Sequence, residues 1–407
     1  MLFHLFGKLI KLKILIIAQR FPYPLDRGDR LTIHHLVKFL SERHQVSLIT
    51  FTARSHDPAW EAELQPYCER IETLPENLFR AYANCAMGLF DDVPLQVHYS
   101  HDPAMVSLVN RVVEETKPDL LYAHYIRMGR YVLPHTHIPR VLAMQLSMTL
   151  NYKRLAEHSK TWIQRQIHFT EYKKLVKFEA DFARRFNQVM LISNRDLAAI
   201  NANPPLENVF FNPHGVDYEY FSPDPNISKE KDSIVFTGNM RYRPNIDGAI
   251  YFCTEILPLI KERIPEVRVY LVGTDPTSEV LALASDPAVT VTGTVPDLRE
   301  NLRKATVAIA PMRITAGLLN KVLEALSMEL PMVVTPQANE GIDAIDGEHL
   351  VIAESAQDFA AEVVHLIENP ARRVELGTAA RAFIQNKWTW EAHLKELEQS
   401  FINIVES

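Results

Sequence analysis

The stretch TVAIAPMRITAGLLNKVLEALSMELPMVVTP, residues 306–336, has the pattern of one strand–loop–helix–strand unit. Its apolar ends, 306–311 and 331–336, are near-continuous runs of the kind found in strands buried on both faces of a parallel sheet. Between them a loop carries Gly317, and a helical stretch then runs to about Met328. A strand, a helix and a second strand form the repeating unit of an α/β fold.

The same alternation extends through the rest of the chain. Four segments with apolar residues at helical spacing lie between the runs: 30–42, 101–117, 157–186 and 246–264. The other apolar runs are 13–18, 45–51, 119–124, 140–144, 188–192, 233–238, 267–273 and 288–293. Between the last run of the first half and the first run of the second half, residues 203–232 hold five prolines, which is typical of an interdomain connection. The sequence therefore predicts two Rossmann-like domains with parallel sheets facing a cleft.

Length and composition agree with this interpretation and exclude several classes of protein. The chain has 407 residues, of which 47% are hydrophobic and 23% charged, as in soluble globular domains. A net charge of −7 gives the chain no overall positive electrostatic field that would attract a polyanion, so no nucleic-acid partner is expected. The three cysteines fit a reducing compartment, and no signal peptide is evident, so we expect a cytoplasmic protein.

Several catalytic signatures are absent from the sequence. It contains no G-x-G-x-x-G, Walker A, H-E-x-x-H, G-x-S-x-G or Asp-x-Asp motif. The sequence therefore does not support assignment to the dinucleotide oxidoreductases, P-loop NTPases or zinc proteases. We expect neither a cofactor nor a metal. Ligands of parallel sheets bind beyond the carboxyl ends of the strands. These positions are 19–30, 124–130, 238–243, 273–277 and 313–324.

The last of these segments has chemistry suited to a nucleoside diphosphate. A helix that begins after Gly317 presents free N–H groups and a positive dipole end, both of which suit phosphate. Lys321 and Glu324 lie three residues apart on one helix face, so the ammonium suits phosphate and the carboxylate suits two ribose hydroxyls. The alternative is an exposed ion pair between these two side chains, worth a few tenths of a kcal/mol.

The order of Ala316–Gly317, Lys321, Glu324–Ala325 and Pro331–Val334 resembles the donor motif of family 4 glycosyltransferases, which have the GT-B fold. PHGVDYEYF (213–221) resembles the domain junction of that family, and FTGNMRYRPNIDGAIYF (236–252) resembles the start of its nucleotide domain. The helix is most similar to the branch associated with exopolysaccharide and PEP-CTERM sorting loci. The resemblance covers nearly the whole chain.

This resemblance implies roles for individual residues. Glu324 would hold the donor ribose, Lys321 and Arg241 would stabilise the leaving diphosphate, and His124 would act near the reacting centre. The other residues expected to contact the donor are Gly28, Gly238, Arg243, Gly317 and Leu318. Four of these residues have a plainer alternative: Arg241 and Arg243 can belong to a solvated loop, His124 can be packed at a strand end, and Gly28 can belong to a helix-capping turn. The family's first glutamate falls on Ala316, which is a departure from the pattern.

The expected domain organisation has five parts. They are an extension at 1–12, an acceptor domain at 13–215, a linker at 216–232, a donor domain at 233–385 and a C-terminal helix at 386–407 that packs back on the acceptor domain. The resemblance implies a retaining transferase that uses a nucleotide diphosphate sugar and a glycan or lipid-linked acceptor, in exopolysaccharide or other surface glycan synthesis. A nucleotide-sugar 2-epimerase of the same fold, or a non-catalytic nucleotide-sugar-binding protein, is the alternative.

Two segments have compositions suited to peripheral membrane contact. Leu2, Leu5, Phe6 and Leu9 fall on one helical face beside basic residues, as in an interfacial helix, although a plain extension explains them equally well. Residues 145–186 combine aromatic and basic side chains that suit an anionic lipid-linked acceptor, and a solvated charged helix is the alternative. The basic residues of this segment include Lys153, Arg154, Arg165, Lys173, Lys174 and Lys177.

Overall fold

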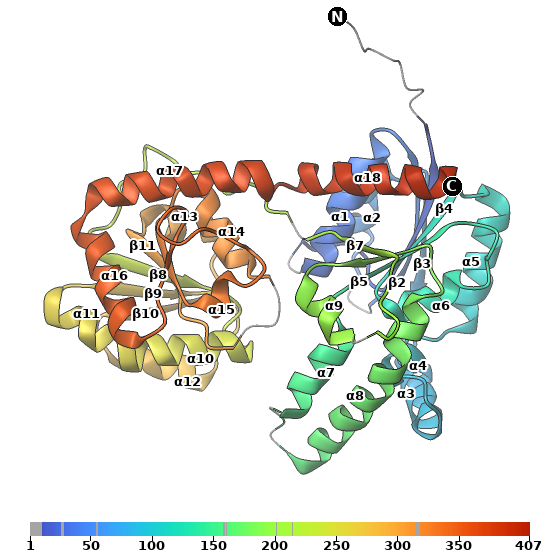
Figure 1. Ribbon diagram of the computed structural model, residues 1–407, viewed down its shortest axis with the longest axis horizontal. Helices are drawn as coiled ribbons and strands as arrows, with labels where there is room; N and C mark the ends of the chain where they lie inside the picture. Colours follow the sequence, from blue (N-terminus) through green and yellow to red (C-terminus); the bar gives the residue numbers. More distant parts are fainter. Residues whose placement is uncertain are drawn as a thin grey trace, which may run out of the picture. The chain divides into compact units, whose positions relative to one another are not determined.

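The fold is that of a computed structural model that describes residues 10–25, 28–53, 56–157, 159, 161–200, 202–213, 215–314 and 318–407. Its contacts divide the chain into two units (Figure 1). Unit 1 comprises Met1–Pro213 and His393–Ser407, and unit 2 comprises His214–Ala392. The predicted linker, residues 216–232, lies within unit 2. The apolar face predicted for the first residues falls on 1–9, outside the described residues.

The core of unit 1 is a parallel sheet in the order β3-β2-β1-β4-β5-β6-β7. The strands are β1 Lys13–Ala18, β2 Gln45–Thr52, β3 Arg70–Pro75, β4 Leu120–His124, β5 Arg140–Gln145, β6 Gln188–Leu191 and β7 Val209–Phe211. The five central strands match the predicted apolar runs. The edge strands β3 and β7 were not predicted, because β3 (RIETLP) mixes charged and apolar residues and β7 (VFF) has only three residues.

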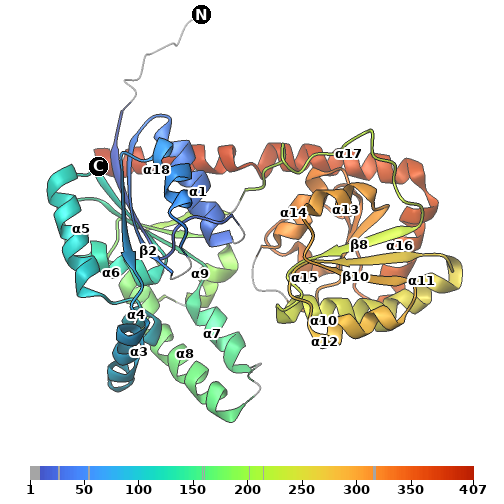
Figure 2. The ribbon, with the colours of Figure 1, turned by 180° about the vertical axis from the view of Figure 1, so that it is seen from behind.

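Helices connect these strands on both faces of the sheet (Figures 1 and 2). They are α1 Gly28–Ser41, α2 Ala59–Leu64, α3 Leu78–Met87, α4 Leu95–Tyr99, α5 Pro103–Thr116, α6 Ile126–Val132, α7 Met148–Glu157, α8 Trp162–Ala183 and α9 Asn194–Ile200. The last helix of the chain, α18 Trp390–Glu406, also packs on unit 1. Its Phe401 ring lies 6.0 Å from that of Tyr122, and its Glu398 carboxylate lies 2.8 Å from the His44 ring.

Unit 2 has a second parallel sheet, in the order β10-β9-β8-β11-β12-β13. Its strands are β8 Ser233–Thr237, β9 Arg268–Val272, β10 Val289–Gly293, β11 Val307–Ala310, β12 Met332–Val334 and β13 Val351–Ile352. The helices are α10 Arg243–Tyr251, α11 Leu257–Arg263, α12 Ser278–Leu281, α13 Leu298–Lys304, α14 Asn320–Ser327, α15 Pro336–Asn339, α16 Ala356–Glu368 and α17 Pro370–Lys387.

The helix predicted over residues 246–264 contains an irregularity. A π-helical turn at Phe252–Ile256 joins α10 to α11 and ends two residues before Pro258. Proline has no N–H for the regular hydrogen-bond ladder of the helix, and a wider turn before it accommodates the lost bond.

The two sheets and the helices around them form two parallel α/β units of Rossmann type, as predicted. Among the described residues, no helix combines the length and the hydropathy that crossing a bilayer requires.

Candidate functional site

In unit 2, the loops after β8 and β11 bring together residues that are far apart in the sequence. Nζ of Lys321, in the first turn of α14, donates to Oδ1 of Asn245 in α10 at 2.7 Å. The ammonium also lies 4.2 Å from the centroid of the Phe236 ring, a cation–π distance. Asn245 is buried and donates through Nδ2 to the carbonyl of Asn239 at 2.9 Å. Lys321 is therefore fixed against the loop that follows β8.

Gly238 is the residue that permits this arrangement. Its φ of +153° lies where side chains are disfavoured, and a Cβ atom there would stand 2.6 Å from Nδ2 of Asn245 and 2.9 Å from Nζ of Lys321. Gly273, after β9, is equally constrained, because its Cβ would stand 1.7 Å from the carbonyl oxygen of Gly238. The predicted pair Gly238 and Lys321 thus share one cluster. Sequence reasoning missed Asn245, the buried amide that joins them.

The charges of Lys321 and Glu324 are destabilised by their surroundings. Burial lowers the pKa of Lys321 to about 7, an effect that the Glu324 carboxylate partly opposes. Burial likewise raises the pKa of Glu324 to about 7, against the opposing effect of Lys321. Within the described part of the chain, the Glu324 carboxylate forms no hydrogen bond or ion pair. Both groups would be stabilised in their charged forms by a ligand with phosphate and hydroxyl groups.

The N-terminus of α14 has the properties that the sequence predicted. Its N-cap residue, Leu319, provides no capping side chain, so the first N–H groups of the helix are not satisfied by a side chain of the cap. Leu318 is partly buried against the core of unit 2. Gly317 and Ala316 lie outside the described residues.

The two predicted phosphate-binding arginines differ in their surroundings. Both side chains are exposed, as the plainer alternative of a solvated loop also requires. Nη1 of Arg243 lies 3.5 Å from Oε2 of Glu279, whereas the Arg241 guanidinium has no partner among the described residues. The backbone N–H of Arg241 donates to Oδ1 of Asn239 at 2.9 Å, which fixes the loop beneath its side chain.

In unit 1, His124 ends β4 and Gly28 begins α1, so both lie at the carboxyl ends of neighbouring strands. His124 is only 2% exposed, and its Nδ1 lies 3.4 Å from the Tyr122 hydroxyl. Its ring centroid is 4.6 Å from that of Tyr125. A Cβ atom on Gly28 would meet no atom within 4 Å, so space does not demand glycine there.

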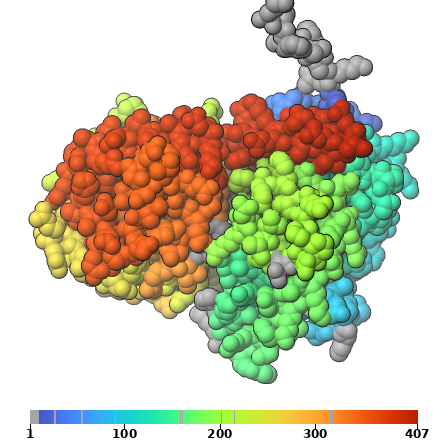
Figure 3. All heavy atoms as spheres, viewed as in Figure 1, coloured from blue at the N-terminus to red at the C-terminus, as the bar shows by residue number. Residues whose placement is uncertain are grey.

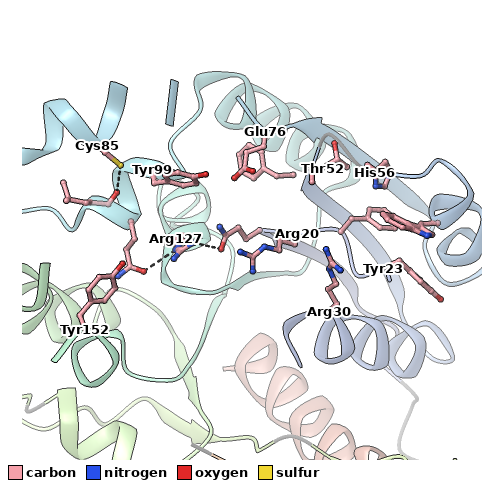
Figure 4. Close-up of a pocket in the computed structure, with 17 residues that line it drawn as sticks. Arg20, Tyr23, Arg30, Thr52, His56, Glu76, Cys85, Tyr99, Arg127 and Tyr152 are labelled. Atoms are coloured by element: carbon pink, nitrogen blue, oxygen red, sulfur yellow. Dashed lines mark hydrogen bonds between the residues drawn. The ribbon is translucent and has the colours of Figure 1, made fainter. Parts of the chain in front are cut away.

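Unit 1 also has a pocket of about 390 Å³ at this edge of its sheet (Figure 4). Gln19 and Arg20 line it after β1, Thr52 ends β2 beside it, and Arg127 reaches it from α6. Aromatic and polar side chains complete the wall: Phe21, Tyr23, Arg30, Phe51, His56, Trp60, Glu76, Cys85, Gln96, Tyr99 and Tyr152. His124 is not among the lining residues. The sequence predicts only those lining residues that fall in the strand-end segments 19–30 and 124–130.

The basic segment 145–186 folds into α7 and α8, which pack against each other. Lys153, Arg165, Lys173 and Lys177 are exposed, as a basic surface requires. Lys174 is an exception to the prediction, because it is buried and donates to the carbonyls of Gly88 and Val93. No group of three or more His, Cys, Asp or Glu residues in the described part of the chain could hold a metal ion.

Comparison with known proteins bears on unit 2 first. Residues 231–369 match the family model described as "Glycosyl transferases group 1". An uncharacterized 44.6 kDa protein in the cps region of Klebsiella pneumoniae is 21% identical over 392 residues, covering 92% of this chain and 96% of that protein. A GDP-mannose-dependent mannosyltransferase of Corynebacterium glutamicum, acting on monoacylated phosphatidylinositol monomannoside, is 25% identical over 252 residues, or 56% of this chain and 63% of its own length.

The fold of the whole chain also has solved counterparts. HepE of Anabaena, solved in complex with UDP, is similar with a TM-score of 0.67 and 14% identity, over 96% of this chain and 100% of that one. The predicted GT-B-like fold and the predicted glycosyltransferase class are confirmed. The family match and these relatives assign no role to individual residues of the two candidate sites.

Proposed function

We propose that this chain, whose unit 2 carries a group 1 glycosyltransferase domain, is a retaining glycosyltransferase that uses a nucleoside diphosphate sugar. The cluster of Gly238, Asn245, Lys321 and Glu324 is the observation that carries the proposal. A cation and a carboxylate, each with its charge destabilised by burial, stand near a helix N-terminus without a side-chain cap. A nucleoside diphosphate supplies the phosphate and ribose hydroxyls that complement both.

In this proposal each residue of unit 2 has a distinct role. Glu324 accepts hydrogen bonds from the two ribose hydroxyls, while Lys321 and Arg241 face the diphosphate and stabilise the charge that grows on it as the sugar leaves. Arg243 assists when it is released from Glu279. Gly238 keeps space open beside Lys321, Gly317 and Leu318 contact the donor, and Asn245 positions the Lys321 ammonium. No metal is required, because cationic side chains neutralise the phosphate charge.

The reaction proceeds with retention by a front-face exchange. The acceptor hydroxyl approaches on the side from which the diphosphate departs, and a phosphate oxygen takes the hydroxyl proton as the new glycosidic bond forms. The chain therefore orients the donor and the acceptor and supplies positive charge to the leaving diphosphate, rather than supplying a nucleophile. His124 contributes near the transferred sugar, and Gly28 lies where the first loop approaches the acceptor.

The acceptor is a growing surface glycan or its lipid-linked precursor, as in the exopolysaccharide branch that the sequence resembles. Support comes from the relative in a cps region and from the surface of α8. Trp162, Ile163 and Ile167 are 74%, 65% and 50% exposed, and the basic side chains of Arg165 and Lys173 lie on the same helix. Apolar side chains flanked by cations suit the face of an anionic bilayer, so we place the enzyme peripherally on the inner face of the membrane.

A transfer assay tests this function. The purified chain is incubated with UDP-, GDP- and dTDP-sugars, with and without polyprenyl-diphosphate-linked acceptors, and the anomeric configuration of the product is read by NMR. We expect one donor to be consumed only with an acceptor, with retention. Epimerisation of the sugar without an acceptor would instead identify the isomerase alternative, and nucleotide binding without turnover would identify the non-catalytic one.

Substitution at Glu324 links that activity to the proposed site. Glu324→Ala should weaken nucleotide binding by about 1.5–3 kcal/mol, because two hydroxyls lose a charged acceptor. The dissociation constant should then rise roughly tenfold to a hundredfold. Glu262→Gln, an exposed carboxylate on α11, is the matched control and should bind as wild type does. Unchanged affinity in Glu324→Ala would remove unit 2 as the donor site.

A further inference from the structure

The pocket of unit 1 contains a guanidinium without a carboxylate partner. Arg127 occupies the second position of α6 and points into the pocket between Tyr152 and Arg20 (Figure 4). Its Nη1 donates to Oε1 of Gln19 at 3.1 Å and its Nε to Oε1 of Gln96 at 3.3 Å. Both acceptors are neutral amides. No carboxylate of the described residues lies within ion-pair distance of Arg127.

Burial makes this arrangement costly unless a ligand completes it. The pKa of Arg127 is lowered because the guanidinium is removed from water, an effect only partly opposed by nearby tyrosines. Buried charges in proteins are normally paired, since an uncompensated one is destabilising. Gln19 and Gln96 satisfy part of the donor capacity of the guanidinium but none of its charge. An anion in the pocket would supply the missing charge.

The other basic side chains that line the pocket already have partners, and so does the nearby carboxylate of Glu171. Arg20 forms an ion pair with Asp29 at 2.7 Å. The carboxylate of Glu171 accepts from the backbone N–H groups of Leu95 and Gln96, at 2.8 and 3.2 Å, so it is committed to α4. Glu76 is the one carboxylate among the described residues that line the pocket, and it can accept hydrogen bonds from sugar hydroxyls. Arg127 remains as the cation that a ligand can neutralise.

The remaining wall of the pocket suits a sugar ring. Sugars present C–H faces that pack on aromatic rings, and aromatic side chains with hydroxyl or indole groups can also hydrogen-bond them. A volume of about 390 Å³ falls in the range of small-molecule sites. The aromatic residues that line this pocket are Phe21, Tyr23, Phe51, Trp60, Tyr99 and Tyr152.

We infer that this pocket binds an acidic sugar residue, with a carboxylate or phosphate group held by the Arg127 guanidinium. A planar guanidinium binds either oxyanion through two parallel N–H···O hydrogen bonds. A neutral sugar has no oxyanion to accept this pair of bonds. The identification of this sugar as part of the acceptor rests on the proposed function, and it adds the chemical class of the acceptor to that function.

Calorimetry with three simple glycosides tests the ligand class. Methyl glucuronide carries the carboxylate, methyl glucoside 6-phosphate carries the phosphate, and methyl glucoside is the neutral reference. Each is titrated into the full-length chain in the presence of saturating nucleoside diphosphate, so that phosphate cannot bind at the donor site of unit 2. We expect one anionic glycoside to bind roughly tenfold tighter than the neutral one or better. The tighter of the two identifies the anion as carboxylate or phosphate.

Variants assign this preference to Arg127. Arg127→Gln should abolish it, and Arg127→Lys, which keeps the charge without the fork, should retain only part of it. Arg130→Gln is the matched control, because Arg130 lies on the same helix, is also partly buried and does not line the pocket. It should keep the full preference. Equal binding of all three glycosides to wild type, or an undiminished preference in a folded Arg127→Gln, overturns the inference.

The nucleotide affinity of the same proteins separates this inference from the proposed function. Arg127→Gln should bind the nucleoside diphosphate as wild type does, since the donor cluster belongs to unit 2. If its nucleotide affinity fell as much as its glycoside affinity, the pocket would be part of the donor site and the inference would fail. If the anionic glycoside bound through Arg127 but no sugar were transferred to any acceptor, the proposed function would fail and the acidic-sugar site would stand.

Discussion

Nζ of Lys321 lies 2.7 Å from Oδ1 of Asn245, a residue 76 positions earlier in the chain. Lys321 and its helical neighbour Glu324 therefore do not form the surface ion pair that their spacing alone allows. Because Asn245 is neutral, it orients the ammonium without cancelling its charge. The ammonium of Lys321 and the carboxylate of Glu324 are therefore both available to bind a ligand.

Nucleotide affinity should be greatest near pH 7. Glu324 is ionised above its pKa of about 7, so affinity should fall as acid protonates it. Lys321 is charged below its pKa of about 7, so affinity should fall as base deprotonates it. Each limb should approach at most about tenfold per pH unit, the effect of one proton. Calorimetric titration of the nucleoside diphosphate, repeated about every pH unit from roughly pH 5.5 to pH 9, measures this profile.

Two variants assign the limbs of that profile. Glu324→Gln should remove the acid limb and move the alkaline limb to lower pH, because the carboxylate no longer opposes the lowering of the Lys321 pKa. Lys321→Met should remove the alkaline limb and move the acid limb to higher pH, because the ammonium no longer opposes the raising of the Glu324 pKa. Because all proteins are titrated with the same nucleotide, the ionisation of its own phosphate is common to them and cancels in the comparison. A profile of wild-type shape in both variants would show that other groups control the pH dependence.

Gly238→Ala should abolish detectable nucleotide binding while leaving the protein folded. The new methyl group would stand 2.6 Å from Asn245 and 2.9 Å from Lys321, so the cluster must separate. Gly293→Ala is the control, because Gly293 has a φ of +67° but no neighbour within 4 Å of its Cβ position. Both variants should lose about 1–2 kcal/mol of unfolding free energy from backbone strain. Equal nucleotide affinity in the two would contradict the role of Gly238.

Turnover should not depend on a divalent metal. The side chains of Arg241 and Lys321 supply positive charge for the diphosphate, so EDTA should leave both nucleotide affinity and turnover unchanged. Arg241→Gln should then weaken nucleotide binding more than Arg243→Gln does, because Arg243 already faces Glu279. Loss of turnover in EDTA that manganese restores would refute this prediction.

His124→Ala should lower turnover while nucleotide affinity stays near the wild-type value. This pattern marks an interaction made mainly in the transition state. Since His124 is buried, the same variant should also lose about 1–3 kcal/mol of unfolding free energy. Tyr122→Phe, which removes the hydroxyl 3.4 Å from Nδ1, separates the two effects: it should change stability but not turnover. Equal loss of turnover in both variants would favour a purely structural role.

The apolar surface of α8 should mediate vesicle binding. The α7–α8 hairpin forms a projection from unit 1 (Figure 3), and serine at Trp162, Ile163 and Ile167 should reduce sedimentation with phosphatidylglycerol vesicles several-fold. Val374→Ser, equally exposed on α17 of unit 2, is the control. Deletion of residues 1–11 tests the second predicted apolar face. If the triple variant still sedimented like wild type, α8 would not be the contact.

The sequence could predict the features that depend on local pattern. Buried parallel strands are apolar throughout, so the central strands of both sheets are visible as runs such as KILIIA at 13–18. Lys321 and Glu324 could be grouped because three residues along a helix return to one face. Strands β3 and β13 could not be found this way, since one is only half buried and the other has two residues.

Only the tertiary structure could identify the partners of these residues. Asn245 holds Lys321 because two loops meet at the edge of a sheet, and no spacing in the sequence records that meeting. Lys174 has the sequence context of a surface cation but is buried against carbonyls of a distant loop. Arg127 is one arginine among many in the sequence, yet its nearest acceptors are Gln19, 108 positions away, and Gln96. Local periodicity determines strands, helices and their faces, whereas the electrostatic environment of a side chain depends on which distant groups folding brings to it.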